Sequence, residues 1–498
     1  MENWGKIPKR EAQSLQDRKL RAFIRYQVYP YSPYYHSLFN KLGLDGYSIS
    51  CVDDLRKIPI TRKEDIAPTK ADPKKPLHLV LQPTAEKVRK HAPTTKLIGM
   101  MSKGKEKAAD SLKKEYSPVH LSFTTGRTAQ PTLFMYTAYD IKRLREALRR
   151  DLHIAGVPRD YKCLNSFPFA PHLAYLASYH GMEENGNLTI HTGGGKAFGT
   201  ARIIDSVETF GPELLLFIPG YCYHVLRTAA EQGRNFSSVK RVGLAAEKAT
   251  PEMKHRILDL LVRMGAKDPE IFSLYAFTEA RSAWVECSMF GEEGYHLFPD
   301  MDIVEIVDPK TGERVGEGEK GEIVYTPLDG RGSVALRYGT GDIAMKGITW
   351  EVCPNCGRTL PRLSSDIRRS SMTKEFRLSK VKGTLVDLNA FSHAMSEIPE
   401  VEEWMVEIRK VNDDPYELDE LLVHVATKPH SNFVELKPKI SSAILKNMEI
   451  VPTHILSHSL EDILKKIGME TELKENRLMD RRPAIDFRPQ YSEGPRTE

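Results

Sequence analysis

The stretch LSFTTGRTAQPTLFMYT at residues 121–137 marks the point where the character of the chain changes. It gathers serine and threonine side chains around Gly126 and Arg127, and it then returns to apolar residues. Such a stretch is typical of a polar turn between two strands, or of a loop whose hydroxyls and backbone N–H groups bind phosphate. From this point strand and helix patterns alternate, so the stretch opens the part of the sequence that decides the fold.

Long helical patterns alternate with short apolar runs after this stretch. The helical patterns are DIKRLREALRRDLHIAG and PEMKHRILDLLVRMG, and the apolar runs are ELLLFIP, VKRVGLAA and IFSLYAF. This alternation predicts a βαβ layout, in which helices cover a mostly parallel sheet. After residue 295, DMDIVEIVD, GEIVYTP and ALRYGTGDIAM predict a strand-rich part punctuated by glycine and proline.

The chain has 498 residues, more than a single ordinary core holds, so about two or three domains are expected. We expect a large α/β domain at residues 1–369, with mostly parallel sheets and a β-rich subdomain. In residues 370–498, GTLVDLNAFSHAMSEIPEVEEWMVEIRK predicts strand, helix and strand, while ELLVHVAT and FVELKPKISSAILKNM add a strand and a helix. This part is therefore expected to form a small α+β domain.

A lysine-rich segment at residues 67–116 interrupts the large domain. It includes TKADPKKP and MMSKGKEKAADSLKKE, and it has few aromatic residues. A charged segment of this composition predicts a solvated insertion or a mobile excursion. Contact with a membrane surface or a partner is the alternative.

The charge balance and hydropathy narrow the class of protein. The 72 basic and 67 acidic residues leave a net charge of +5, which is not the clustered excess expected of a nucleic-acid-binding protein. The start, MENWGKIPKREAQ, is too polar for a secretory signal, and no apolar run approaches a membrane span. We therefore expect a cytoplasmic protein without membrane insertion.

Four motifs occur in a definite order along the chain. The serine- and threonine-rich stretch comes first, then YAFTE at 275–279, LRYGTGD at 336–342 and KENRLMDRR at 474–482. This order resembles the adenylate-forming enzymes, in particular the branch that is similar to phenylacetate–CoA ligase. That family's motifs read like S-S-G-T-T-G-K-P-T, Y-G-x-[ST]-E, R-Y-x-T-G-D and K-x-x-R-x-x-D. The resemblance covers nearly the whole chain apart from the lysine-rich segment.

The resemblance implies an ATP-dependent ligase. A carboxylic acid, of the aromatic class by the same resemblance, would attack the α-phosphate of ATP, giving acyl-AMP and pyrophosphate, and CoA would then take the acyl group as a thioester. Transfer to an amine or a carrier protein, and a catalytically inactive ligand-binding scaffold, are the alternatives. The implied cofactors are ATP, Mg²⁺ and CoA. Nucleic acid is not expected as a partner, and the formation of a homodimer is left open.

The resemblance also implies roles for individual residues, and their chemistry suits those roles. Glu279 would hold Mg²⁺, Thr278 would offer its hydroxyl to the α-phosphate, and Lys474 would offset charge in the transition state. Asp342 would accept hydrogen bonds from the ribose hydroxyls. The other candidates for ATP binding are Ser122, Thr124, Thr125, Gly126, Arg127, Ala246, Glu247, Tyr275 and Arg369.

Aromatic and glycine residues are nominated for the acyl pocket. The segments NSFPFAPHLAY and HTGGGK lie where the family lines the acyl or CoA side. Aromatic residues at such spacing are also typical of core packing, and the glycines of a tight turn. The acyl-pocket candidates are Tyr136, Phe167, Phe169, His172 and Gly194.

The cysteines suggest a metal site. Cys353 and Cys356 form CPNCG, a zinc-knuckle sequence in which two thiolates can bind one ion. Zinc-containing relatives show a similar cysteine–histidine pair after the catalytic glutamate, which nominates Cys287 and His296 as partners. Three thiolates and an imidazole suit a closed structural Zn²⁺ site. Reduced thiols in a turn, or redox chemistry, are the alternatives.

Several positions depart from the family pattern. Phe123 replaces the first glycine of the phosphate loop, and Ala276 replaces the glycine of the second motif. The resemblance implies that the small domain is mobile and turns about a hinge. At that hinge Ser370 and Ser371 stand where relatives carry an acidic residue, and Leu473 replaces a glycine before the lysine.

Overall fold

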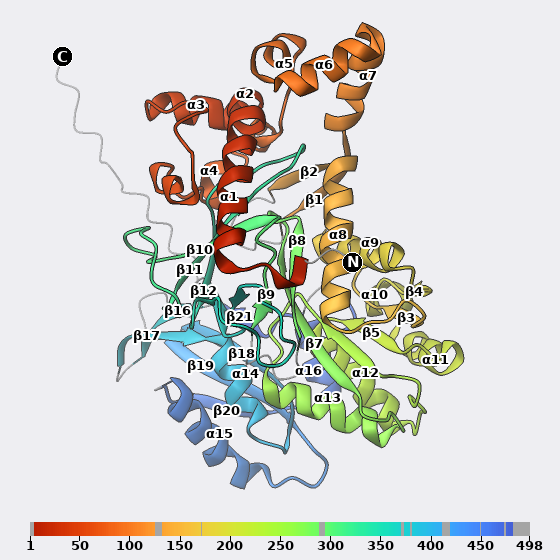
Figure 1. Cartoon of the computed structure of the whole chain (residues 1–498). Helices are drawn as coiled ribbons and strands as arrows, with labels where there is room; N and C mark the ends of the chain where they lie inside the picture. The colour runs from red at the N-terminus through yellow and green to blue at the C-terminus, as the bar shows by residue number, and fades with distance from the viewer. Residues whose placement is uncertain are drawn as a thin grey trace, which may run out of the picture. The chain divides into compact units, whose positions relative to one another are not determined.

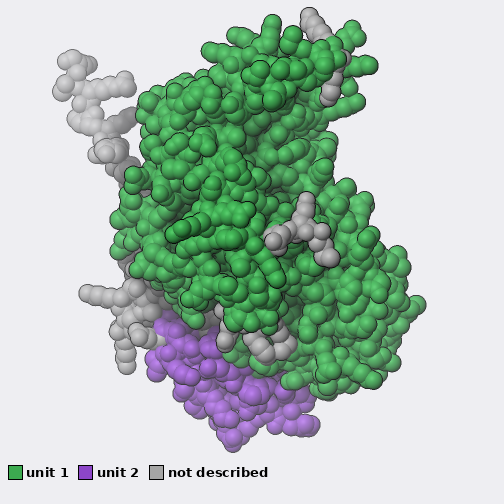
Figure 2. All heavy atoms as spheres, in the orientation of Figure 1, with its two compact units in different colours: residues 1–370 green, residues 371–498 purple. Residues whose placement is uncertain are grey.

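The computed structural model describes residues 4–124, 132–170, 172–287, 294–369, 373–378, 381–410, 419–448, 450–472 and 475–481. It divides into unit 1, Met1–Ser370, and unit 2, Ser371–Glu498 (Figure 2). Unit 1 contains every described residue of the first three motifs, and unit 2 contains the described residues of the fourth.

A nine-stranded sheet forms the centre of unit 1, and five of its strands are parallel, as the sequence predicts. All four residues of β5 (Leu214–Phe217) are buried, because helices cover both faces of a parallel sheet. Gly243 of the next strand leaves room for two neighbours, since a Cβ there would lie 2.6 Å from Leu216 and 2.8 Å from Phe272. The other parallel strands are β3 (Cys163–Asn165), β4 (Thr189–His191), β6 (Arg241–Leu244) and β7 (Glu270–Phe277).

Beyond β7 the same sheet continues with antiparallel strands. β8 (Ser282–Glu286) pairs with β7 and places Trp284 opposite Tyr275. β9 (Tyr295–His296), β14 (Arg362–Leu363) and β13 (Ile348–Thr349) follow in that order. The large sheet is therefore mixed, and segments distant in sequence meet at its antiparallel edge.

Helices flank the parallel part of this sheet (Figure 1). α8 (Ala138–Ile154) begins with a capping box, because Thr137 and Asp140 hydrogen-bond each other's backbone N–H groups. No described helix has the length and the apolar composition needed to span a membrane. The remaining helices of this part are α9 (Leu173–Asn185), α10 (Gly195–Phe198), α11 (Thr200–Phe210), α12 (Pro219–Glu231) and α13 (Pro251–Arg263).

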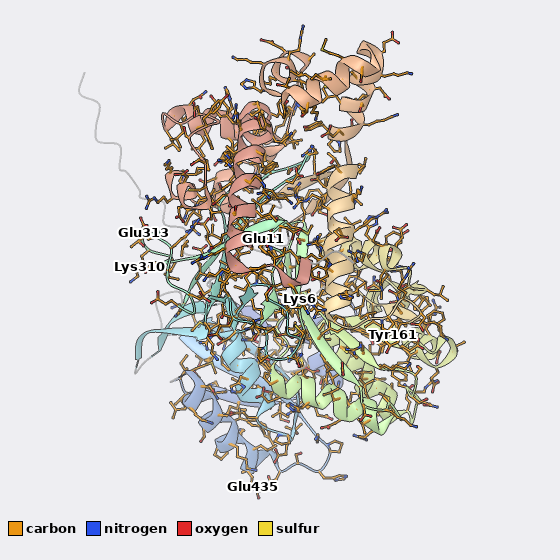
Figure 3. All side chains as sticks on the ribbon, viewed as in Figure 1. Lys6, Glu11, Tyr161, Lys310, Glu313 and Glu435 are labelled. Atoms are coloured by element: carbon orange, nitrogen blue, oxygen red, sulfur yellow. The ribbon has the colours of Figure 1, made fainter. Side chains whose placement is uncertain are left out.

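The predicted strand-rich part is an antiparallel four-stranded sheet. Its order is β10 (Asp302–Val307), β11 (Gly321–Pro327), β12 (Tyr338–Ala344) and β15 (Ile367–Arg369). Lys310 and Glu313 mark the exposed turn between β10 and β11 (Figure 3). β12 carries the third motif into this sheet.

Helices dominate the residues that precede the first motif. The lysine-rich segment contains α5 (Ala85–His91), α6 (Thr94–Lys103) and α7 (Lys105–Tyr116). These helices lie above α8 in the view of Figure 1. The side chain of Glu115 at the end of α7 pairs with Lys96 and with Arg331. The other elements are η1 (Trp4–Lys6), α1 (Lys9–Phe23), η2 (Ile24–Val28), α2 (Tyr29–Tyr31), α3 (Pro33–Lys41), η3 (Val52–Lys57), α4 (Lys63–Ile66) and η4 (Lys75–Leu79).

Unit 2 has the α+β pattern that the sequence predicts. Its four-stranded mixed sheet runs in the order β20, β19, β18 and β21, and its core includes Phe391 of α14 and Trp404 of β18. Glu435 of α15 is exposed and points away from the ribbon (Figure 3). The elements are β16 (Thr373–Leu378), β17 (Val381–Asp387), α14 (Leu388–Ser396), β18 (Val401–Lys410), β19 (Asp419–Thr427), α15 (Phe433–Met448), β20 (His454–Ser457), α16 (Leu460–Ile467) and β21 (Leu478–Asp480).

Candidate active site and a cysteine–histidine cluster

The first motif lies on an antiparallel hairpin of β1 (Pro118–Phe123) and β2 (Leu133–Thr137). Ser122 is fully buried, and Thr124 bonds to Thr132 twice. The backbone N–H of Thr124 donates to the carbonyl of Thr132 at 3.0 Å, and the N–H of Thr132 donates to Thr124 Oγ1 at 3.2 Å. These bonds close the base of the loop between the strands. The candidates Thr125, Gly126 and Arg127 lie outside the described residues, so their roles stay predictions.

The second motif ends in a turn that is held from two sides. The buried phenol of Tyr136 on β2 donates to the carbonyl of Thr278 at 3.0 Å. Tyr325 of β11 donates to the carbonyl of Ala280 at 2.8 Å. Burial raises the pKa of Tyr136, so its phenol stays protonated and remains a donor. Thr278 and Glu279 thus lie in a buried, hydrogen-bonded turn.

Two hydrogen bonds join the second motif to the third. The phenol of Tyr338 donates to Glu279 Oε1 at 2.6 Å, and the phenol of Tyr275 donates to Asp342 Oδ2 at 2.8 Å. Asp342 is also opposite Arg369 in the β12–β15 ladder. The fold therefore brings together four residues, Tyr275, Glu279, Tyr338 and Asp342, which we call the motif site.

The motif site combines two carboxylates with two neutral phenols. A phenol satisfies an acceptor without cancelling its charge, so each carboxylate keeps the ability to bind a cation or a hydroxyl donor. Glu279 is buried and Asp342 is half-buried. Glu279 suits Mg²⁺, which takes one or two carboxylates and completes its shell with water and phosphate oxygens.

The candidates at the end of β6 lie in a loop with an unusual backbone. Ala246 is exposed and has φ of 74°, a left-handed conformation that costs about 1–2 kcal/mol for an L-residue. Glu247 is half-buried, and Lys248 pairs with Asp366 at 2.7 Å. The ion pair fastens this loop to the segment just before β15.

The acyl-pocket candidates divide into buried and exposed side chains. Tyr136 and Phe167 are buried, whereas Phe169 is 53% exposed. The ring of Phe169 lies 4.7 Å from that of Tyr175 and packs on Gly193, where a Cβ would come within 2.1 Å. Tyr136 alone of this set has a described hydrogen bond to the second motif. His172 Nδ1 lies 3.2 Å from the carbonyl oxygen of Phe123, and Gly194, with φ of 79°, precedes α10.

The fourth motif is only partly described. Lys474 and Leu473, and also Ser370 and Ser371 of the expected hinge, lie outside the described residues. Arg477, three positions after the lysine, is half-buried in unit 2 and pairs with Glu403 at 2.8 Å. This part of the motif therefore anchors β21 to β18.

The four predicted metal ligands meet at the antiparallel edge of the large sheet. Cys287 follows β8, His296 ends β9, and Cys353 and Cys356 lie between β13 and β14. Their ligand atoms all lie within 4.8 Å of one another. The Cys287 and Cys353 sulfurs are 3.5 Å apart, as are the Cys356 sulfur and His296 Nε2. We call these four residues the thiol cluster.

The dimensions of the thiol cluster fit a small tetrahedral ion. Zn–S bonds of about 2.3 Å and Zn–N bonds of about 2.0–2.1 Å require ligand atoms about 3.6–3.8 Å apart. The side-chain amide of Asn355 donates to the Cys287 carbonyl at 2.8 Å and approaches its sulfur at 3.4 Å. The donor set and its spacing therefore suit Zn²⁺, with no position left open for a substrate.

Sequence reasoning gave no role to three residues of this region, although Asp140 and Tyr338 belong to the stretches that carry the resemblance. Tyr338 lies inside the third motif and bonds to Glu279. Asp140 and Arg281 flank the first and second motifs and pair with each other at 2.9 Å. Polar residues beside motif positions were the available signal, but only the fold shows which of them meet.

The sequence model of the AMP-binding enzyme family matches residues 54–331, more than half of the chain. The chain therefore belongs to the AMP-binding enzyme family. It is 28% identical over 371 residues to a phenylacetate–coenzyme A ligase of Thermus thermophilus, which covers 73% of this chain and 72% of the relative. A phenylacetate–coenzyme A ligase of Aromatoleum evansii is 23% identical over 490 residues, covering 95% of both chains.

A solved structure shares the fold over nearly the whole chain. It is 2-hydroxyisobutyryl-CoA ligase in the post-adenylation state, in complex with R3-HIB-AMP. The TM-score is 0.73 at 19% identity, with 96% of this chain and 92% of that chain covered. This likeness supports the α/β architecture with its antiparallel sheet and its small C-terminal mixed sheet.

Proposed function

We propose that this protein is an acid–CoA ligase that forms an acyl-adenylate from a carboxylic acid and ATP, releases pyrophosphate and then transfers the acyl group to CoA. The observation that carries the proposal is the interlocking of the second and third motifs through Tyr275–Asp342 and Tyr338–Glu279. Family membership and the relatives named phenylacetate–coenzyme A ligase support it. The same relatives favour an aromatic acid.

In the first step, a carboxylate oxygen of the acid attacks the α-phosphorus, and the bond from that phosphorus to the β-phosphate bridging oxygen breaks. Thr278 would donate its hydroxyl to the α-phosphate, and Asp342 would accept from the ribose hydroxyls. Glu279 would hold Mg²⁺, which offsets the charge of the phosphates. Lys474 would stabilise the charge that builds up on the reacting carboxylate and phosphate.

The roles predicted from the sequence for the two domains and for the other candidate residues are part of this proposal. Unit 1 would be the adenylation domain, and unit 2 would be the mobile domain that carries Lys474. Ser122, Thr124, Thr125, Gly126 and Arg127 would bind the pyrophosphate part of ATP. Ala246, Glu247, Tyr275 and Arg369 would surround the nucleoside, and Tyr136, Phe167, Phe169, His172 and Gly194 would line the acyl side.

We also propose that the thiol cluster holds a structural Zn²⁺. Cys287, His296, Cys353 and Cys356 would supply all four ligands, and their spacing supports this proposal. The ion would fasten the knuckle between β13 and β14 to β8 and β9. Its contribution would be to stability, since a closed site leaves no room for catalysis.

The test is acid-dependent release of pyrophosphate from ATP and Mg²⁺, over a panel of aryl and short fatty acids, with and without CoA. We expect release only when an acid is present, and about 100-fold slower release in Lys474→Ala. Lys465→Ala is the matched control, because Lys465 is an exposed lysine of unit 2 on α16. It is expected to behave like the unchanged protein.

The outcomes separate the candidate functions. Formation of an acyl-CoA thioester would establish CoA as the acceptor. Pyrophosphate release that is indifferent to CoA would instead point to an amine or a carrier protein. ATP binding without turnover for any acid would overturn the ligase proposal in favour of a ligand-binding scaffold.

A further inference from the structure

Asp140 is the meeting point of three segments of unit 1. It is the third residue of α8 and is 2% exposed. Its Oδ1 accepts from Arg281 Nη1 at 2.9 Å and from the backbone N–H of Arg331 at 3.1 Å. Its Oδ2 accepts from Thr137 N–H and hydroxyl, both at 2.9 Å, and from Gly332 N–H at 2.8 Å. These donors use the whole acceptor capacity of one carboxylate.

Arg281 is held in a conformation that needs external support. It follows Glu279 by two positions, and its φ of 54° lies in the left-handed region. A non-glycine residue there costs about 1–3 kcal/mol and persists only where the surroundings hold it. The buried guanidinium pairs with Asp140, and a Cβ at Gly330 would lie 2.8 Å from Arg281 Nη2. Gly330 therefore makes room for this pair.

The Asp140–Arg281 pair connects the first motif to the turn of the second. β2 is the second strand of the first motif and ends at Thr137, the N-cap residue of α8, whose N–H donates to Asp140. Arg281 ends the turn that carries Glu279, and β8 begins at the next residue. The same two segments are also joined by the bond from Tyr136 to the Thr278 carbonyl. The pair thus adds a charged, fully buried tie between the two motifs.

We propose that the Asp140–Arg281 pair is a positioning device that fixes the Glu279 carboxylate for Mg²⁺ and ATP. This inference rests on the proposed function, because it gives Glu279 its assigned role. Neither residue of the pair belongs to the motif site, and both would act through the turn. Removal of such a supporting contact typically weakens metal affinity about 10- to 100-fold.

A second buried ion pair, at the other end of β8, provides a matched control. Lys254 and Glu286 pair at 2.8 Å, with both side chains 3% exposed, compared with 4% and 2% for Arg281 and Asp140. Glu286 ends β8, whereas Arg281 precedes its first residue. Glu286 also accepts from the N–H of Ser273 at 3.1 Å. Loss of either pair removes a buried charge interaction, but only one pair adjoins the motif site.

The experiment compares Arg281→Met, Arg281→Lys and Asp140→Asn with Lys254→Met in the full chain. Melting temperature, ATP binding by calorimetry as a function of Mg²⁺, and acid-dependent pyrophosphate release are measured. We expect Arg281→Met to raise the Mg²⁺ concentration for half-maximal ATP binding about 10-fold or more. Arg281→Lys should recover part of this loss. Lys254→Met should lower the melting temperature and leave the Mg²⁺ dependence within about threefold.

The outcomes are distinguishable from those that test the proposed function. If the unchanged protein binds Mg²⁺ and ATP but turns over no acid, the ligase proposal fails while the calorimetry still decides the role of the pair. Equal shifts of the Mg²⁺ concentration for half-maximal ATP binding in Lys254→Met and Arg281→Met would overturn the positioning role, because both pairs would then act through the stability of the fold alone. An unchanged Mg²⁺ dependence in folded Arg281→Met and Asp140→Asn, or no ATP binding by the unchanged protein, would also overturn it.

Discussion

The Glu279 turn of the motif site and the thiol cluster lie at the two ends of one strand, and the two sites are built in opposite ways. β8 separates the turn of Glu279 from Cys287, and its five residues span about 17 Å. In the motif site, two carboxylates accept hydrogen bonds from phenols. At the other end, four metal-binding side chains face one another and leave no position for a substrate.

This difference shows that unit 1 can contain one site suited to ligands that bind and leave and another suited to an ion that stays bound. The motif site keeps negative charge that is satisfied but not neutralised, so it is suited to bind and release substrates. The thiol cluster brings together residues 66 positions apart, such as Cys287 and Cys353, where a bound ion would hold the edge in place. The comparison predicts that damage at one end changes activity and damage at the other changes stability.

The largest effect is expected from Glu279→Gln. The substitution keeps the shape of the side chain but removes the charge proposed to hold Mg²⁺, so acid-dependent pyrophosphate release should fall about 100-fold or more. The melting temperature and the zinc content should not change. Glu313→Gln, at an exposed turn residue (Figure 3), is the control and should keep full activity. Loss of zinc in Glu279→Gln would contradict the expectation that the motif site and the thiol cluster act independently.

Removal of the metal should give the opposite result. We expect one zinc per chain by elemental analysis, lost in Cys353→Ser, together with a fall in melting temperature on the order of 5 °C. Well below the new melting temperature, the KM for ATP should stay within about threefold. Cys163→Ser is the control, because Cys163 is buried on β3 and is not one of the four ligands. A protein that retains its metal after Cys353→Ser would contradict the proposed ligand set.

A third carboxyl group, that of Asp302, sharpens the comparison because it is buried within unit 1. Neither carboxyl oxygen of Asp302 has a described hydrogen bond, and burial raises its pKa to about 8, with Asp300 contributing. The folded-state pKa lies above the unfolded value. The contribution of the protonated Asp302 carboxyl group to the free energy of unfolding is therefore fully present below about pH 4 and is lost as the pH rises through 8. Asp302→Asn should raise stability at pH 8 by on the order of 2 kcal/mol and flatten this slope.

Denaturant unfolding between pH 5 and pH 8 checks this prediction. Asp308→Asn is the control, since Asp308 is a half-buried residue directly after β10 whose carboxylate accepts backbone N–H bonds. It should not reproduce the gain at high pH. An identical pH slope with and without the Asp302 carboxyl group would refute the assignment.

The smallest effect is expected from Tyr275→Phe. This change removes the phenol that donates to Asp342 and keeps the ring, so about 1 kcal/mol of hydrogen-bond energy is lost. The KM for ATP should rise about fivefold, while kcat changes little. Steady-state kinetics with ATP varied measures the effect. A fall in kcat alone would place Tyr275 in the chemical step rather than in nucleotide binding.

Much of the architecture was predictable from local patterns in the sequence. Apolar runs such as ELLLFIP become buried parallel strands because short β-branched or leucine-rich segments need cover on both faces. The helix at Ala138–Ile154 was predictable from its apolar periodicity. The metal ligands were nominated by residue type and by the resemblance, and the fold brings all four together.

The contacts that join the motifs were decided by the tertiary structure alone. Tyr338 meets Glu279 across 59 positions of sequence, and Arg281 meets Asp140 across 141. Which polar residue becomes a partner depends on strand order and register, and a one-residue slip turns a side chain to the other face. The sequence by itself therefore determined the elements, the order of the motifs and the candidate ligands, and the pairing of the sheets decided which of them meet.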